Sequence, residues 1–486
     1  MAGSTNLEQD APKKQIILNA FDFFAGSHLS HGQWRNPKDR GINKFTDLSY
    51  WTNLAQILER GDITSLFLAD DYGQYDIYKE SSETAIRGAA IWPKADPIIP
   101  ISAMAAVTTN LSFALTGSTT YETPFTLARR YSTMDNLLKG RFGWNIVTSF
   151  QESGARLIGE EMVEHDKRYK IADDFVRILY KLWEGSWADD ALNLDADREI
   201  YTNPDRVRYI HHDSEYFKLD GPHSVPPSPQ RTPFLFQAGT SKAGIEFGAL
   251  HAEAIFVAAS SPYILAPRVK QIREAAAAAG RDPQSVKVVA ILTPIIGHTH
   301  EEAVAKYEEA QKYASVETTL AFWSGNAGID LSKLDLDKVI EPSDSSIDHR
   351  SHSLADAYTY RGTDIPPLTP RNIAKNIAIG ADGPTPVGTA EEVADLIEQW
   401  IEIADLDGFN IAQVLSPASF EDVVDLLVPE LRKRGRYPAK GESVGRTLRE
   451  RIYGEGQSRL REDHIGYTYR HENSDRYAEQ DKLPRK

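Results

Sequence analysis

The chain has 486 residues, 41% of them hydrophobic, so it is long enough to bury a large core. Its formal net charge of −16, without a long basic run, argues against nucleic acid and against an anionic membrane surface as partners. There is no cysteine, which excludes disulfides, thiolate catalysis and Cys–zinc sites. The first residues lack the apolar core of a signal peptide, and no run approaches the ~18 apolar residues of a membrane span, so we expect a cytoplasmic protein.

Eight short apolar runs predict β-strands, at residues 16–21, 65–69, 111–116, 142–147, 233–238, 254–257, 286–292 and 409–414. Helical patterns lie between most of them, at 47–60, 124–138, 165–183, 262–279 and 391–404. Thr389 and Glu392 form a capping box at the head of the last one. Strands separated by helices in this way predict an α/β fold of the (β/α)₈ or TIM-barrel type.

A bare barrel needs roughly 250 residues, so the rest must lie in insertions. We expect a single domain over 1–486, with the barrel at about 16–434 and insertions at about 74–97, 186–230 and 314–386. Residues 436–486 form a polar, charged C-terminal tail, expected to lie over the surface or a neighbouring subunit. Loops this long after barrel strands are usually lids or substrate walls, which makes 314–386 the candidate lid.

One stretch, residues 231–257, predicts a binding site. Residues 234–236 are a short apolar run before Gly239, which fits a buried strand and a turn, and Thr240 and Ser241 then open a helical pattern. Backbone N–H groups at a helix N-terminus point outward, the helix dipole favours negative charge, and the hydroxyls add donors. The pattern therefore predicts a phosphate site, although Ser and Thr are also ordinary helix caps.

The other polar residues of interest also follow predicted strands, where the chemistry of a barrel gathers. They are rich in hydroxyls and amides, poor in clustered carboxylates, and lack an activated nucleophile with its base. Such a lining suits a large polar cofactor held by many hydrogen bonds. These residues are His28, His31, Asp70, Thr116, Asn145 and Ser149.

Several of these residues also fit purely structural roles. His28 and His31 are a possible metal pair, but no His-x-His lies on the first strand and no HExxH pattern occurs, so a structural role and a donor role remain open for His31. Asp70 also fits a turn or cap. His165 and Tyr169 lie four apart and share a helix face, either as a surface pair or reaching towards a phosphate. No GxGxxG after a strand and no Walker A motif is present, so no nicotinamide site is indicated.

Several segments together resemble the flavin-dependent monooxygenases of the bacterial luciferase superfamily. The resemblance runs from about residue 16 to about residue 454. It is closest to the branch that contains nitrilotriacetate monooxygenase component A, dibenzothiophene-sulfone monooxygenase and the large chain of pristinamycin synthase. The matching segments are SHLSHGQWRNP, FLADDYGQYD, GRFGWNIVTS, HDKRYKIADDF, FQAGTSKAGIEFGALHAEAIF and TLRERIYG.

The resemblance implies that the carboxyl ends of the strands hold reduced FMN (FMNH₂). The residues expected to bind it, carried over by motif, are Asp70, Thr116, Asn145 and Ser149 at the ring and ribityl chain, His165 and Tyr169 at the ribityl-phosphate end, and Thr240 and Ser241 at the phosphate. His31 is the expected polar contact near the flavin C4a and His28 the second candidate, which makes them the candidate catalytic residues. No metal is expected.

The resemblance also implies a reaction. Reduced FMN and O₂ would give a C4a-(hydro)peroxide that transfers one oxygen atom to a small organic substrate. Because no nicotinamide motif is present, a separate NAD(P)H:flavin reductase would supply the reduced flavin. Relatives are dimers or tetramers, so we expect a homo-oligomer. The alternatives are a non-catalytic flavin-binding protein of the same fold, a deazaflavin-dependent oxidoreductase, or a metal-dependent hydrolase. The sequence does not name the substrate.

Overall fold

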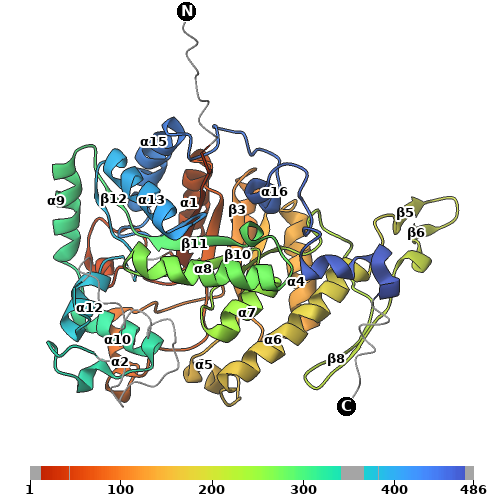
Figure 1. Ribbon diagram of the computed structural model, residues 1–486, viewed down its shortest axis with the longest axis horizontal. Coiled ribbons are helices and arrows are strands. Elements are labelled where there is room, and N and C mark those ends of the chain that lie inside the picture. The colour runs from red at the N-terminus through yellow and green to blue at the C-terminus, as the bar shows by residue number, and fades with distance from the viewer. Residues whose placement is uncertain (1–12, 43, 341–365, 381, 477–486) are drawn as a thin grey trace, which may run out of the picture.

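The structure, a computed structural model, describes residues 13–42, 44–340, 366–380 and 382–476 (Figure 1). Eight parallel strands close into a barrel in the order β1-β14-β11-β10-β9-β4-β3-β2. Each predicted strand is one of them, with ends shifted by at most three residues, so the predicted (β/α)₈ barrel is confirmed. The strands are β1 (Ile17–Phe23), β2 (Ser65–Ala69), β3 (Ser112–Ser118), β4 (Phe142–Val147), β9 (Phe234–Gln237), β10 (Ala254–Val257), β11 (Lys287–Leu292) and β14 (Gly408–Ile411).

Helices pack around the barrel and bury their apolar stripes against it. The predicted helices correspond to α1 (Leu48–Arg60), α4 (Pro124–Leu137), α6 (His165–Tyr180), α8 (Pro262–Ala278) and α13 (Ala390–Ala404). The capping box at Thr389 and Glu392 is present. The helix predicted to end at residue 183 instead passes into a π-helical turn at Lys181–Gly185. The remaining helices of the barrel region are α3 (Ile101–Ala106), α5 (Glu152–Leu157), α7 (Lys242–His251), α9 (His300–Gln311), α14 (Ala418–Asp422) and α15 (Val428–Lys433).

Aromatic side chains fill the barrel interior. Phe67 contacts Phe236 edge-on, with ring centroids 5.2 Å apart, and its ring lies 5.7 Å from that of Phe21. Phe256 completes the group at 5.5 Å from Phe21. This packed layer makes the barrel a solid core rather than a channel, so a ligand has access only from an end.

The predicted insertions have structure of their own. Residues 74–97 contain α2 (Glu83–Gly88), and 186–230 form two hairpins that project from the barrel, β5 (Leu192–Asp195) with β6 (Ile200–Thr202) and β7 (Ile210–Asp213) with β8 (Lys218–Gly221) (Figure 1). The candidate lid 314–386 includes α10 (Val316–Ala327) and α12 (Pro370–Ile377), while its residues 341–365 and 381 lie outside the described residues. β12 (Ile295–Ile296) and β13 (Val387–Gly388) pair beside it.

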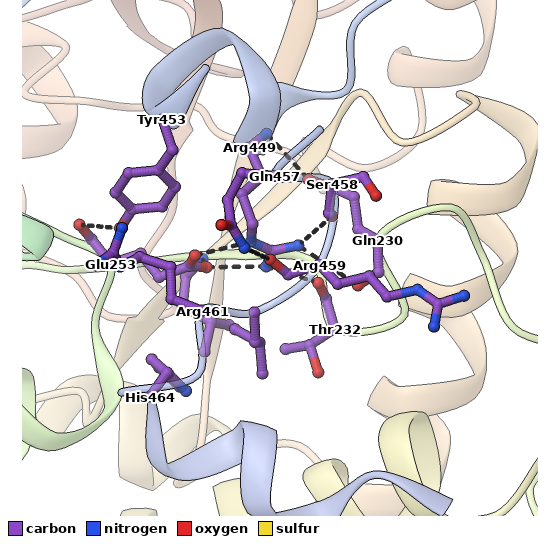
Figure 2. Close-up of polar contacts among 12 residues, drawn as sticks. Gln230, Thr232, Glu253, Arg449, Tyr453, Gln457, Ser458, Arg459, Arg461 and His464 are labelled. Atoms are coloured by element: carbon purple, nitrogen blue, oxygen red, sulfur yellow. Dashed lines mark hydrogen bonds and ion pairs between the residues drawn. The ribbon is translucent and has the colours of Figure 1, made fainter. Parts of the chain in front are cut away.

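The C-terminal tail is anchored across the amino-terminal end of the barrel, centred on α16 (Leu448–Tyr453). Figure 2 shows Arg449, whose side chain is fully buried, reaching Glu253 just before β10. Its Nε and Nη2 donate to the two carboxylate oxygens at 2.7 and 2.9 Å, and Nη2 also donates to the Thr232 carbonyl at 2.8 Å. In this segment the tail therefore lies over the amino-terminal end of the barrel and also buries the Arg449 side chain there.

In the part of the chain that the structure describes, no helix is both long enough and apolar enough to span a membrane.

Candidate functional site

A cavity of about 480 Å³ opens at the carboxyl ends of the barrel strands. Its volume lies within the range of about 300–1,000 Å³ that is typical of small-molecule sites. Phe21, Phe67 and Phe256 form an apolar floor, and polar residues from the strand ends and from α6 and α7 line the walls. All of the predicted cofactor-binding residues lie on this cavity, namely Asp70, Thr116, Asn145, Ser149, His165, Tyr169, Thr240 and Ser241.

At one end of the cavity, β9 turns into α7, as the sequence predicts. Ser241 is the N-cap of α7, and its side chain accepts a hydrogen bond from Gly244 N at 3.1 Å. The capping role is therefore right for the Ser241 oxygen, and the Ser241 hydroxyl also lies near the Tyr169 hydroxyl. The turn is tightly packed at Gly239, because a Cβ there would clash with Tyr169 Oη. Burial raises the pKa of Tyr169, so its hydroxyl stays protonated and can donate.

Arg168 is a cavity residue that the sequence reasoning missed. It lies on the first turns of α6 beside Tyr169 and His165, and only 7% of it is exposed. Among the described residues, no carboxylate forms an ion pair with Arg168, and its buried Nε has no hydrogen-bond partner. Burial lowers the pKa of Arg168, but a guanidinium stays charged in proteins. An unpaired, buried cation is costly unless an anion comes to it.

A second polar group occupies the ends of β3 and β4, where Thr116 and Asn145 are paired in register. Asn145 Nδ2 donates to Thr116 Oγ1 at 2.9 Å, while the buried Asn145 Oδ1 has no partner in the described part of the chain. Ser149 adopts φ of 50°, an uncommon conformation for a residue with a side chain, and its hydroxyl lies 2.8 Å from Ser118 Oγ. Backbone of this kind concentrates at ligand sites. Gln237 on β9 also lines the cavity, and no pattern in the sequence singled it out.

Asp70 lies at the end of β2 and lines the cavity. Burial raises the pKa of Asp70 to about 7, an effect that Lys94 opposes and that Asp96 and Glu122 reinforce. Near neutral pH this carboxyl is therefore divided between its neutral and ionised forms. A group poised in this way is able to hold or release a proton at the cavity wall.

His28 and His31 are not among the residues that line the cavity. His28 Nε2 lies 3.3 Å from Asp39 Oδ2, and His28 Nδ1 accepts a hydrogen bond from Ser30 N. His31 is fully buried behind the wall, with its ring centroid 4.7 Å from that of Phe322, which does line the cavity. Burial, aided by the nearby His28, lowers the pKa of His31 to about 3, so the ring is neutral. The structure brings neither histidine to the cavity surface, and a contact with a cofactor stays a prediction for both.

Within the described residues, no group of three or more His, Cys, Asp or Glu side chains is arranged to hold a metal ion. The histidine pair considered from the sequence faces different partners, since His28 pairs with Asp39 and His31 packs on Phe322.

Comparison with known proteins gives one family. Residues 22–406 match the model of the luciferase-like monooxygenases. The long-chain alkane monooxygenase of Geobacillus thermodenitrificans (strain NG80-2) is 43% identical over 95% of this chain and 99% of its own length. The dimethyl-sulfide monooxygenase of Hyphomicrobium sulfonivorans is 42% identical over 94% of each chain. A crystal structure of riboflavin lyase with modified FMN and its substrate riboflavin superposes with a TM-score of 0.86 at 38% identity, covering 94% of this chain and 100% of that one.

The fold and the cavity are those of a TIM-barrel enzyme with its site at the carboxyl ends of the strands. The chain belongs to the luciferase-like monooxygenase family. The resemblance noted from the sequence is therefore confirmed, and the protein is a monooxygenase.

Proposed function

We propose that this protein is a two-component monooxygenase that uses reduced FMN and O₂ to oxygenate a small organic substrate. The observation that carries the proposal lies at one end of the cavity, where Arg168, whose buried Nε has no hydrogen-bond partner among the described residues, lines the wall together with the N-terminus of α7. A phosphate bound there would accept a hydrogen bond from the buried Arg168 Nε and would pair with a cation that has no ion-pair partner among the described residues.

The residues present fit the flavin along the whole cavity. Arg168, Tyr169, Thr240 and Ser241 would bind the phosphate, with His165 beside them. The unpartnered Asn145 Oδ1 offers an acceptor to a ring or ribityl group. The other residues that would line the ring and ribityl chain are Asp70, Thr116 and Ser149. These roles are proposals that rest on the position of each residue and on the family motifs.

The cofactor, when bound, supplies the electrons with which O₂ is activated for transfer of one oxygen atom to the substrate. The protein orients the reactants and excludes water. The aromatic floor and the apolar wall of Phe322 and Trp323 exclude water from one side of the cavity. Asp70 would hold or release a proton beside the ring. The neutral His31 ring supports Phe322 from behind, and a direct contact between His31 and the ring would need a movement of that wall.

A separate flavin reductase is the proposed partner. The chain carries no dinucleotide motif, and two of its relatives are named as parts of larger systems, one as component A of nitrilotriacetate monooxygenase and one as a pristinamycin IIA synthase subunit. Arg168 is the only Lys or Arg among the described residues that line the cavity, and it is proposed to bind the FMN phosphate. No second cation is therefore left in the described lining for the phosphates of a nicotinamide dinucleotide, which fits reduction of the flavin by a second protein. We expect a homo-oligomer in the cytoplasm, as the sequence suggests.

The proposed substrate is a small, uncharged molecule. No Lys or Arg other than Arg168 lines the cavity among the described residues, and one part of its wall is apolar, built by Phe322, Trp323 and Ile377. Relatives at 42–43% identity are named for a long-chain alkane and for dimethyl sulfide, both of which are uncharged.

The test compares the oxygen consumed with the peroxide released. The purified chain is mixed with FMN, NADH and a generic flavin reductase, and candidate substrates are ranked by O₂ uptake minus H₂O₂ release. We expect at least one uncharged substrate for which uptake exceeds peroxide and an oxygenated product appears. If all the O₂ emerges as H₂O₂ across the screen, the non-catalytic flavin binder is favoured. Tighter binding of a deazaflavin than of FMN would favour the deazaflavin-dependent oxidoreductase.

A further inference from the structure

Lys94 lies at the end of the insertion 74–97 and reaches back to the loop that follows β2. Residues 93–95 run beside the loop after β1, through hydrogen bonds from Gly26 N to the Pro93 carbonyl at 2.7 Å and from Ala95 N to the Phe24 carbonyl at 2.9 Å. From this support the Lys94 ammonium forms an ion pair with Asp71 and donates to the Gly73 carbonyl at 2.6 Å. Its side chain is only 12% exposed, so these contacts are largely shielded from water.

The loop that Lys94 contacts, residues 70–73, forms part of the cavity wall. Two further hydrogen bonds hold the same loop. Asp71 Oδ2 accepts them from Tyr75 Oη at 3.1 Å and from Gln151 Nε2 at 3.4 Å. The Asp71 carboxylate thus joins Lys94 to the β4 side of the cavity mouth. Without Lys94, the Asp71 charge would lose its cation and the Gly73 carbonyl would lose its donor.

The Lys94 charge also acts on Asp70, the residue that precedes its ion-pair partner Asp71. Burial raises the pKa of Asp70, the carboxylates of Asp96 and Glu122 act in the same direction, and Lys94 is the cation that opposes them. Glu122 is itself paired with Arg130 at 2.8 Å. Burial lowers the pKa of Lys94 to about 8, so it is still mostly charged at neutral pH.

We propose that Lys94 is a positioning residue of the flavin site, which holds the loop 70–73 against the cavity through its ion pair with Asp71 and its hydrogen bond to the Gly73 carbonyl. Because Asp70 directly precedes Asp71 in this loop, the Lys94 ammonium also acts on the Asp70 carboxyl. The part of this inference that concerns Asp70 is a property of the protein alone. The part that concerns flavin binding rests on the proposed function.

The first experiment needs no flavin. The carboxyl band of protonated Asp70 is assigned in the infrared spectrum by its loss in Asp70→Asn, and its titration is followed in Lys94→Met, Lys94→Gln and Lys94→Arg. Removal of the opposing cation raises the proton affinity of Asp70, so the midpoint should move to higher pH by about one unit or more in the two neutral variants. It should return towards the wild-type midpoint in Lys94→Arg. Lys79→Met is the matched control, because Lys79 belongs to the same insertion but pairs with Glu317 with 53% of its side chain exposed.

The second experiment measures FMN affinity by quenching of flavin fluorescence. Lys94→Met removes both the charge and the donor to Gly73, so it should weaken FMN binding several-fold. Lys94→Gln, which keeps a donor, should weaken it less, and Lys79→Met should not change it.

FMN affinity that is unchanged in Lys94→Met, with the wild-type protein binding FMN, would overturn the inference. Failure of the wild-type protein to bind FMN at all would instead overturn the proposed function, while the infrared result would stand. If Lys94→Met does not fold, judged by its thermal melt, Lys94→Gln decides the charge effect.

Discussion

Replacement of Arg168 by methionine separates the phosphate site from the rest of the cavity. Methionine keeps much of the apolar stem of arginine and removes its charge and donors. A hydrogen bond to a charged group contributes about 1.5–3 kcal/mol, which corresponds to a loss of FMN affinity of roughly 10- to 150-fold. Riboflavin lacks the phosphate, so its affinity should be unchanged. Because Arg168 is 7% exposed and has no carboxylate partner among the described residues, the variant without ligand should be more stable, by about 1 kcal/mol or more.

The assay is fluorescence titration of wild type, Arg168→Met and Lys170→Met with FMN and with riboflavin, accompanied by urea unfolding without ligand. Lys170 is an exposed cation on the same helix and controls for the change in net charge. The expected result is a fall in the preference for FMN over riboflavin in Arg168→Met alone. Equal losses for both ligands, or no loss for either, would show that Arg168 does not contact a phosphate and would refute the reasoning.

Three further sets of variants test other parts of the site and the fold. Thr240→Ala combined with Ser241→Ala should weaken FMN binding by about 1–3 kcal/mol. Unchanged FMN affinity in a titration would show that the two hydroxyls do not bind the phosphate. His31→Ala should leave FMN affinity largely intact and raise the fraction of O₂ released as H₂O₂. If product formation still accounts for all the O₂ consumed, the role of His31 is structural. Arg449→Met leaves the buried Glu253 carboxylate without its partner, so the free energy of unfolding should fall by about 3–5 kcal/mol in urea. Addition of Glu253→Gln should recover part of that loss, and additive losses would contradict the pairing.

The turn from β9 into α7 was predictable because its signal is local. An apolar strand, a glycine and two hydroxyls before a helical pattern occupy consecutive positions, and the structure has Ser241 as the cap. Arg168 was missed because a charged residue on a helix is usually solvent-exposed. The signal that was available is its spacing, since His165, Arg168 and Tyr169 lie three and four apart and so share one face.

Contacts between distant segments left no such signal. The partner of His28 is Asp39, which lies in a loop with no regular pattern, and the position of His31 behind Phe322 depends on how residues 314–327 pack on the barrel. The Arg449–Glu253 pair joins residues 196 positions apart, so a tail that is polar in sequence was expected at the surface. A polar residue signals burial only when its partner is known, and the partner comes from the fold.

The central claim, that the cavity binds FMN with its phosphate at Arg168 and at the N-terminus of α7, is tested most directly by a crystal of this protein soaked with FMN. We expect density for the phosphate within hydrogen-bonding distance of Arg168, Thr240 and Ser241, and for the ring between Asp70 and Asn145. Clear density for FMN elsewhere on the molecule, or for FMN in the cavity with its phosphate away from Arg168, would contradict the claim.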